Sequence, residues 1–297
     1  MIVGARPEES IFECVANISE GRDLGIIGRL EAACAGTLID RHSDRHHHRS
    51  VFTLAGTLEE VQDSARALST AAVELLDLTA HRGVHPRFGV VDVVPFVPVA
   101  DGELDLTAVV AARDRFARWL AAEHGVPTFL YGPLREGHER TLPEVRRSAF
   151  TALQPDFGPQ APHPTAGACA VGARGPLIAY NLWLDDGDPE IARHIAAAIR
   201  GPSVRALGFD IDGVGQVSCN LIDPFTVGPA EIFDEVARRL RVEHRSIARA
   251  ELVGLVPARV ISAIPPQRWS ELGLDPNASI EARLARNASV RTQRLRP

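Results

Sequence analysis

The same order of predicted elements occurs twice along this chain of 297 residues. Each half reads as strand–helix–strand–strand–helix–strand, with alternating apolar residues in the strands and three- and four-residue spacing in the helices. This is the split βαβ order of ferredoxin-like domains. Such a unit covers one face of its antiparallel sheet with helices and leaves the other face to be buried. The sequence therefore predicts an α+β protein with two ferredoxin-like (βαββαβ) subdomains whose sheets face each other across a ligand cleft.

The two halves are not identical. The first carries one helix and one strand more than the βαββαβ unit; its predicted strands are 12–18, 37–40, 50–55, 88–99 and 126–131, and its helices are 23–35, 58–75 and 106–123. The second contains predicted strands 177–184, 204–211, 215–222 and 251–256, with helices 189–199 and 229–240.

Composition then divides the chain into four segments. Residues 1–152 form the predicted N-terminal subdomain, and residues 174–264 form the C-terminal one. Residues 153–173 between them are rich in Pro and Gly, which favours a linker that also contributes a loop to the site. Residues 265–297 are polar and rich in Arg, and we expect them to form a peripheral tail.

Several classes of protein are disfavoured by composition. A formal net charge of −6 gives no basic surface of the kind that binds nucleic acid. The four cysteines are scattered without a C-x-x-C motif, which fits a reducing compartment. The first residues show no secretory signal, and no apolar stretch is long enough to span a membrane. We therefore expect a cytoplasmic protein with no nucleic-acid or membrane partner.

A polar cluster precedes the longest apolar strand, in the stretch HRGVHPRFGVVDVVPFVPV at 81–99. Pro86 biases His85 towards an extended backbone at the entrance of that strand. A fixed imidazole beside Arg87 is a candidate acid–base catalyst. A histidine that only hydrogen-bonds a loop fits the local features equally well.

The segment RHSDRHHHR at 41–49 is the richest in histidine. Consecutive residues of a strand point to opposite faces, so these histidines do not form a closed ligand set of the zinc type. We therefore predict no metal site. Arg49 is instead predicted to bind a substrate carboxylate, because its planar guanidinium matches that group.

Polar residues in the second half have two interpretations each. Residues 167–175 lack the Lys and Ser or Thr of a phosphate loop, and they fit either a close backbone approach to a ligand or a tight turn. Asn181 is either a satisfied core amide or a side chain that points into the cleft. Gln216, Ser218 and Asn220 share one face of a strand, which suits either a heteroaromatic ligand or solvent.

Seven short motifs follow one another in a fixed order up to about residue 263. They are ECVANISEG (13–21), HRSVFTLAG (48–56), the stretch 81–99, PDFGP (155–159), VGAR with LIAYN (171–181), QVSCNL (216–221) and ELVGLVP (251–257). Together they resemble the glutamate formimidoyltransferase family, in the stand-alone form without a cyclodeaminase domain.

The resemblance implies two ferredoxin-like subdomains that enclose a folate tunnel, and a homodimer. The family's catalytic histidine lies in the motif H-P-R-[MF]-G, which is His85 here. The family's folate-contacting loop follows PDFGP, and here it consists of Gly158, Pro159, Gln160, Ala161, Pro162, His163, Pro164, Thr165, Ala166 and Gly167.

Three positions depart from the family pattern. His48 and Trp183 stand where the family commonly has asparagine, and Ala16 stands where it commonly has proline. Amides lost from a cleft would change the contacts with the amino-acid half of the substrate. The departures therefore concern the formimidoyl donor and leave the predicted fold unchanged.

The implied reaction transfers a formimidoyl group from N-formimidoyl-L-glutamate to tetrahydrofolate, in histidine degradation and one-carbon metabolism. His85 is the predicted acid–base residue; Arg49, Arg87, His48 and Asn181 are the predicted substrate-binding residues. Tetrahydrofolate is a co-substrate, and no tightly bound cofactor is expected. The alternatives are an amidine or amide hydrolase that uses the histidine cluster, and a non-catalytic folate-binding relative.

Overall fold

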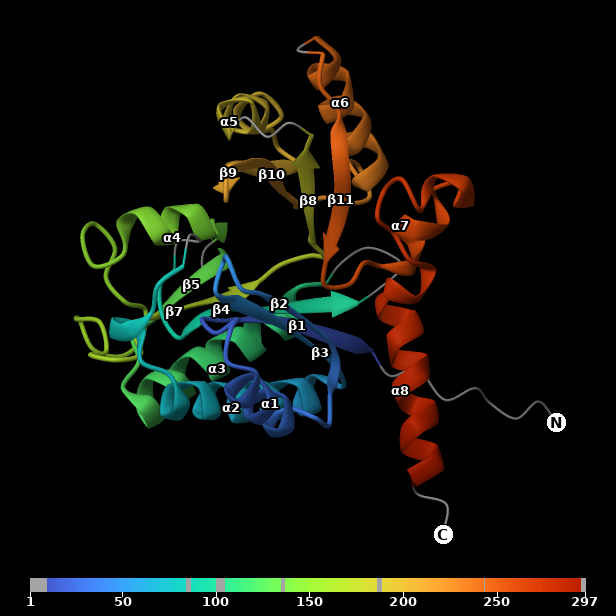
Figure 1. Cartoon of the computed structure of the whole chain (residues 1–297). Helices are drawn as coiled ribbons and strands as arrows, with labels where there is room; N and C mark the ends of the chain where they lie inside the picture. The colour runs from blue at the N-terminus through green and yellow to red at the C-terminus, as the bar shows by residue number, and fades with distance from the viewer. Residues whose placement is uncertain are drawn as a thin grey trace, which may run out of the picture. The chain divides into compact units, whose positions relative to one another are not determined.

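The computed structural model describes residues 10–83, 87–99, 105–134, 137–185, 189–242 and 244–294 (Figure 1). The chain divides into two compact units, Met1–Arg174 and Gly175–Pro297. Each unit has its own sheet, so the α+β class with two subdomains is confirmed. The cleft expected between the sheets stays a prediction.

The first unit is built on a mixed sheet. Over its described residues this sheet has seven strands in the order β2-β3-β1-β4-β7-β5-β6. The strands are β1 (Ile11–Ile18), β2 (Leu38–Asp44), β3 (Arg49–Gly56), β4 (Val91–Val99), β5 (Thr128–Pro133), β6 (Glu139–Arg140) and β7 (Cys169–Ala173). The helices are α1 (Leu24–Ala33), α2 (Leu58–Leu75), α3 (Thr107–His124) and α4 (Leu142–Ser148), with a 3₁₀ turn η1 (Leu78–Ala80). The elements β1 to β4 follow the predicted βαββαβ order, and β5, β6 and β7 extend the sheet beyond β4.

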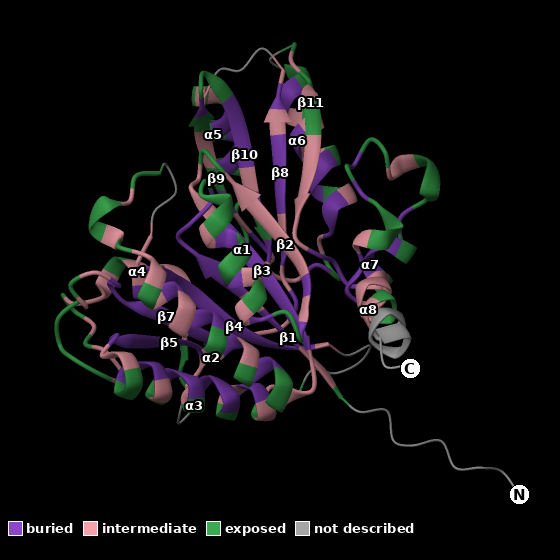
Figure 2. Cartoon of the chain, turned by 60° about the horizontal axis from the view of Figure 1, so that its bottom comes forward, coloured by how far each residue is buried: buried purple, intermediate pink, exposed green. Residues whose placement is uncertain are grey.

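The helix α2 shows how sequence and packing agree in this unit. Thr57 and Glu60 form a capping box at its start, which satisfies backbone N–H groups that the helix leaves unpaired. Val61, Ala65 and Leu68 then form a fully buried stripe, as an amphipathic helix on a sheet requires. The helices α1, α2 and α3 lie on one side of the sheet, as Figure 2 shows through their buried inner faces.

The second unit contains an antiparallel sheet in the order β11-β8-β10-β9. Its elements are β8 (Ile178–Leu184), α5 (Pro189–Ala198), β9 (Val204–Ile211), β10 (Val214–Leu221), α6 (Pro229–Val242) and β11 (Ile247–Val253). These follow the βαββαβ order predicted for this half. Asp212 and Gly213 both have positive φ angles and form the tight turn between β9 and β10 that the Asp-Gly pair predicts.

The structure divides the chain differently from the four predicted segments. Residues 153–173, predicted as a linker, belong to the first unit, and they include β7 at 169–173, which pairs in parallel with β4 and β5. Gly172 is required there because a Cβ would lie 2.0 Å from the Tyr131 ring. A buried strand of small residues therefore stands where we expected a loop.

The segment after residue 265 is also more than a peripheral tail. It contains η3 (Pro266–Arg268), η4 (Pro276–Ala278) and α8 (Ile280–Arg294), and it follows α7 (Ala258–Ser262). Leu272 is fully buried in the core of the second unit, and its carbonyl accepts a hydrogen bond of 2.7 Å from the Tyr180 hydroxyl. The start of this segment therefore completes the core. Within the described ranges, no helix combines the length and apolar character needed to cross a membrane.

Candidate active site

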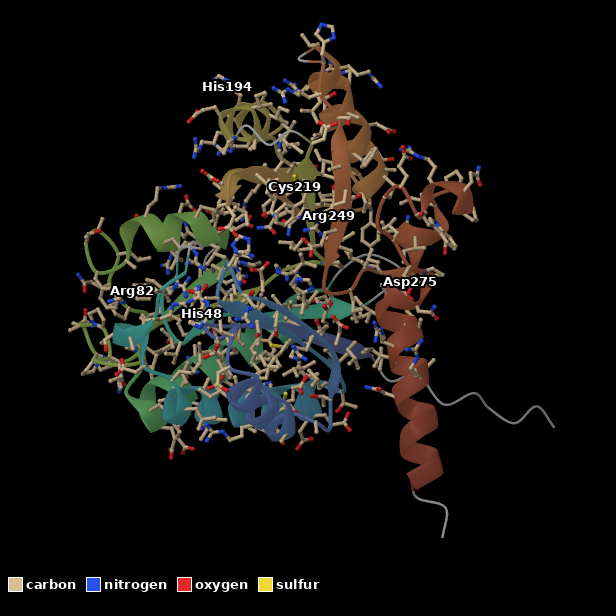
Figure 3. The ribbon with its side chains drawn as sticks, in the orientation of Figure 1. His48, Arg82, His194, Cys219, Arg249 and Asp275 are labelled. Carbon is tan, nitrogen blue, oxygen red and sulfur yellow. The ribbon has the colours of Figure 1, made fainter. Side chains whose placement is uncertain are left out.

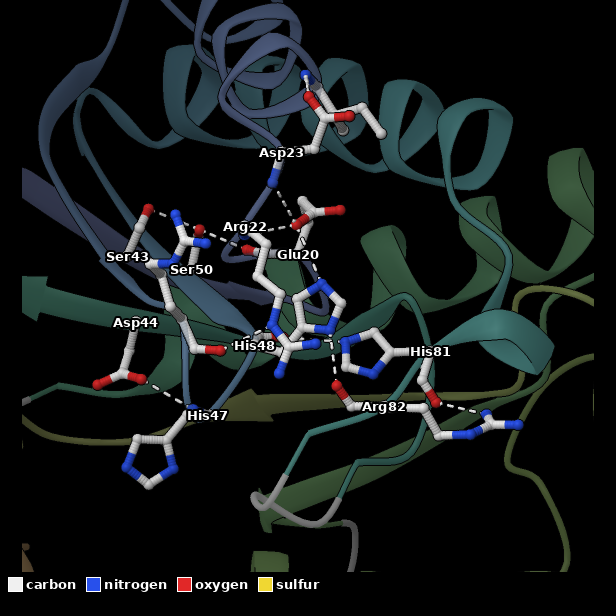
Figure 4. A network of polar contacts seen from close by, with 12 residues as sticks. Glu20, Arg22, Asp23, Ser43, Asp44, His47, His48, Ser50, His81 and Arg82 are labelled. Carbon is white, nitrogen blue, oxygen red and sulfur yellow. Dashed lines mark hydrogen bonds and ion pairs between the residues drawn. The ribbon is translucent and has the colours of Figure 1, made fainter. Parts of the chain in front are cut away.

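Three segments of the first unit meet at one end of β1 (Figure 4). They are the loop after β1 (19–23), the turn between β2 and β3 (45–48), and the segment before β4, described at 81–83 and 87–90. Two glycines allow the close approach. A Cβ on Gly21 would lie 2.3 Å from the Asp44 carbonyl oxygen, and a Cβ on Gly83 would lie 2.7 Å from the His47 carbonyl oxygen.

The Glu20 carboxylate connects the first two of these segments, the loop after β1 and the turn between β2 and β3. Its Oε1 accepts backbone N–H bonds from Arg22 at 2.7 Å and Asp23 at 3.0 Å, and it lies 3.1 Å from Nε2 of His48. Burial alone would raise the pKa of Glu20, but these backbone bonds and His48 hold it below its usual value. Glu20 is therefore ionised at neutral pH.

His81 lies against His48 in the same network. The two rings stack with their centroids 3.9 Å apart, and Nε2 of His81 lies 2.9 Å from the His48 carbonyl oxygen. The Arg87 guanidinium contacts the ring nitrogens of His81. Burial and the charge of Arg87 lower the pKa of His81 to about 4. His81 is therefore neutral at pH 7, with one nitrogen donating to a carbonyl and the other facing a cation.

This pKa predicts how stability depends on pH. In the unfolded chain His81 titrates near its ordinary value of 6.5, whereas in the folded protein it titrates at about 4. Between these values the unfolded state binds more protons, so the free energy of unfolding falls as the pH is lowered. Urea unfolding at pH 7, 6 and 5 should show a shallower loss for His81→Gln than for the natural protein. Equal slopes would contradict the lowered pKa of His81. Glu20, whose pKa is also lowered, is present in both proteins and therefore contributes to both slopes.

A buried carboxylate organises the arginines next to this network. Asp92 is 1% exposed; its Oδ1 accepts the Phe88 N–H at 2.5 Å and its Oδ2 accepts Nη2 of Arg146 at 2.6 Å. Arg49 interacts electrostatically with Asp92, Arg146 and Arg87. Burial lowers the pKa of Arg49 to about 10, so Arg49 remains charged at pH 7. This set is richer in positive than in negative charge, which suits the carboxylates of a small acidic ligand.

The predicted folate loop lies beside the segment that leads into β4. The carbonyl of Thr165 accepts the Leu78 N–H at 2.7 Å, and the carbonyl of Ala166 accepts the Val90 N–H at 3.0 Å. Gly167 has a φ angle of +72°, and a Cβ there would lie 2.5 Å from the Phe88 carbonyl oxygen. The end of the loop is thus tied to the chain close to His85 in sequence, whereas residues 158–162 are exposed.

In the second unit, the face of β8 opposite its buried apolar residues carries a polar group. Glu251 Oε2 accepts the indole N–H of Trp183 at 3.1 Å and the Asn181 amide at 3.4 Å. The Arg249 guanidinium lies 4.1 Å from the centre of the Trp183 ring. Gln216, which pairs with Trp183 across the sheet, is fully buried, and its amide has no hydrogen-bond partner among the described residues. Buried amides are normally paired, so Gln216 is an unsatisfied polar group within this face.

The histidine-rich segment folds as a strand end and a turn. The strand β2 continues to Asp44 and β3 begins at Arg49, so the predicted connection is short. Asp44 Oδ1 accepts the backbone N–H groups of His46 and His47, both at 2.8 Å. Asp44 thereby closes the turn. In the described part of the chain, no three His, Cys, Asp or Glu side chains are grouped as metal ligands.

Because the spacing of the histidines at 41–49 lacks a closed set of metal ligands, we expect activity to be insensitive to metal removal. After dialysis against a strong chelator, the protein should retain most of its turnover in the assay. Stoichiometric metal after dialysis, with activity lost on chelation and restored by one ion, would contradict this expectation.

Comparison with known proteins identifies the family. The model of the formiminotransferase domain, N-terminal subdomain, matches residues 11–174. This chain belongs to the formiminotransferase family. It is 35% identical to a glutamate formimidoyltransferase of Streptococcus pyogenes, over 84% of this chain and 90% of the relative. It is 34% identical to one of Thermoplasma acidophilum, over 95% of this chain and 99% of the relative.

A longer relative also aligns with this chain. The formimidoyltransferase-cyclodeaminase of Sus scrofa is 34% identical over 84% of this chain, and the match covers 51% of that relative. The family assignment made from the motifs is confirmed, and so is the class of enzyme, a glutamate formimidoyltransferase-like transferase. The names of the relatives support formimidoyl transfer as the general activity.

The structure brings together only some of the predicted site residues. Arg49, Arg87 and His48 lie in or beside the network of the first unit, whereas His85 lies outside the described residues. Asn181 lies in the second unit, so its part in a shared site stays a prediction. Three residues of the site were not predicted from the sequence: Glu20, Asp92 and Arg146. Only Asp92 gave a signal, as an acidic residue within a run of valines.

Proposed function

We propose that this protein transfers the formimidoyl group of N-formimidoyl-L-glutamate to tetrahydrofolate. The observation that carries the proposal is the cationic set formed by Arg49, Arg87 and Arg146 around Asp92, next to the segment that contains His85. The donor is a dicarboxylate, and guanidinium groups bind carboxylates through paired hydrogen bonds. The names of the family members support the same chemistry.

In the proposed mechanism His85 moves the protons. The attacking nitrogen of the folate ring forms a bond to the amidine carbon and gives its proton to the His85 imidazole. The resulting tetrahedral intermediate breaks the bond between that carbon and the glutamate nitrogen, and His85 returns the proton to the departing amine. A group with an ordinary pKa of about 6.5 can accept and donate a proton in turn at neutral pH. The products are glutamate and 5-formimidoyltetrahydrofolate.

The other residues of the proposed site bind the two substrates. Arg49 and Arg87 bind the carboxylates of the donor, Asn181 contacts its amino-acid half, and the loop 158–167 contacts the folate. Tetrahydrofolate is a co-substrate, and the reaction requires no tightly bound cofactor. We further propose a cytoplasmic homodimer that acts in histidine degradation and one-carbon metabolism.

The experiment that tests this function follows glutamate release from N-formimidoyl-L-glutamate by the purified protein. Release should require tetrahydrofolate and should saturate with both substrates. Release at the same rate without folate would favour an amidine hydrolase. Folate binding without any turnover would favour a non-catalytic relative.

A further inference from the structure

His48 occupies a backbone conformation that few residue types adopt. Its φ angle is +50°, in the left-handed region where asparagine, aspartate and histidine are enriched among residues with side chains. The turn that ends at His48 is held by the two backbone bonds to Asp44. The turn therefore fixes the direction in which the imidazole leaves the chain, towards Glu20 and Arg82 (Figure 4).

Both ring nitrogens of His48 face hydrogen-bond acceptors. Nδ1 lies 2.9 Å from the Arg82 carbonyl oxygen, and Nε2 lies 3.1 Å from Oε1 of Glu20. Since a carbonyl and a carboxylate only accept, both bonds form together only when both nitrogens carry a proton, and the charge of Glu20 balances that form. The side chain of His48 is 14% exposed, and one face of its ring is covered by His81. No ring N–H remains for a substrate, which differs from the substrate-binding role predicted for His48.

The same turn contacts the chain on both sides of His85. Before it, the Arg82 carbonyl accepts from His48, and Gly83 lies against the turn with an ideal Cβ 2.9 Å from the His48 Cβ. After it, Nη2 of Arg87 donates to the His47 carbonyl at 3.1 Å. These contacts fix Arg82, Gly83 and Arg87, which flank His85 in the sequence. Small displacements of a catalytic group are costly, because a misplacement of about 1 Å can reduce the rate by about a hundredfold.

We infer that His48 is a positioning residue for His85: its Nδ1–H bond to the Arg82 carbonyl fixes the segment before the catalytic residue, and Glu20 fixes the ring. The inference rests on the proposed function, since it takes His85 as the acid–base group. His48 and Glu20 therefore affect the rate of the chemical step rather than the affinity for the donor.

Three substitutions of His48 separate its two hydrogen bonds. His48→Asn places an amide N–H near the position of Nδ1 and tolerates the positive φ angle. His48→Gln places its amide near the position of Nε2, so it retains a contact with Glu20 but not the bond to Arg82. His48→Ala removes both. We expect kcat to fall at least tenfold in the Ala and Gln variants, and kcat of the Asn variant to be at least fivefold higher than that of the Ala variant.

Steady-state kinetics in both substrates provide the first test. The KM for N-formimidoyl-L-glutamate should change less than threefold in all three variants, because the change acts on the chemical step. His194→Ala is the matched control, since that histidine is exposed on α5 of the other unit (Figure 3). A large rise in KM with unchanged kcat would show that His48 binds substrate and would overturn the inference. An Asn variant as slow as the Ala variant would overturn the role of the Nδ1 bond.

Hydrogen exchange followed by mass spectrometry gives a test that does not depend on activity. In the peptide that spans residues 78–92, His48→Ala should exchange at least threefold faster than the natural protein, and His48→Asn should restore protection. Equal exchange in the natural protein and the Ala variant would overturn the inference. If the natural protein failed to turn over N-formimidoyl-L-glutamate, the proposed function would fail, while the exchange result would still decide whether His48 holds this segment.

Discussion

Replacing His85 with alanine is expected to lower kcat by about a hundredfold or more, since proton transfer by a positioned side chain typically contributes a factor of that size. The affinity for folate should remain nearly unchanged, because the proposed folate contacts lie in the loop 158–167. Single-turnover kinetics with saturating folate would measure the chemical step, and equilibrium binding of folate would measure the affinity.

His81→Ala is the informative comparison for this variant. Both ring nitrogens of His81 are engaged, one by the His48 carbonyl and the other by the Arg87 guanidinium, so His81 is poorly suited to exchange protons with a substrate. Its loss should reduce the chemical step much less than the loss of His85. Near-normal turnover by the His85 variant, or a larger defect in the His81 variant, would refute the proposed catalytic residue.

The second large effect is expected at Arg49. The Arg49→Lys variant keeps the positive charge but loses the planar pair of donors that matches a carboxylate. We expect kcat/KM for N-formimidoyl-L-glutamate to fall by about thirtyfold or more, which corresponds to roughly 2 kcal/mol, the lower end for a buried charged contact. The dissociation constant of folate should change little. Steady-state kinetics and folate titration together measure both values.

A matched control for Arg49→Lys is Arg193→Lys on α5, where the side chain is 47% exposed. This substitution should leave kcat/KM for the donor unchanged. Arg49 also donates to the Asn17 carboxamide oxygen, so thermal unfolding should establish that the variant is folded under the assay conditions. A folded Arg49→Lys variant with unchanged kcat/KM for the donor would contradict the assignment of Arg49 to the substrate carboxylate.

The parts of the fold with long apolar runs or clear helical spacing could be predicted from the sequence. The strand β4 follows from its valines, and α2 follows from the apolar stripe that runs from Leu58 to Leu75. The strand β7 could not be predicted, because CAVGA offers only one β-branched residue and its small side chains are typical of loops as well. Its burial depends on the neighbouring strands β4 and β5, and above all on the Tyr131 ring over Gly172.

The candidate site could be predicted only at positions where the side chain itself indicates what it binds, as arginine does for carboxylates. Arg49 and Arg87 were selected as carboxylate ligands, and they lie in the cationic set. Asp92 and Arg146 are 54 residues apart in the chain and meet through α4, a helix too short to show periodicity. His48 was selected for its residue type, but the partners of its ring depend on a positive φ angle and on Glu20, which a linear pattern does not reveal.

The most direct measurement follows the formimidoyl carbon itself. N-formimidoyl-L-glutamate labelled with ¹³C at that carbon would be incubated with the purified protein and tetrahydrofolate, and the products would be separated and examined by mass spectrometry and NMR. The label is expected to move to the folate, in step with the release of unlabelled glutamate. Label that appears instead in formamide, formate or N-formylglutamate, at a rate independent of folate, would contradict this expectation.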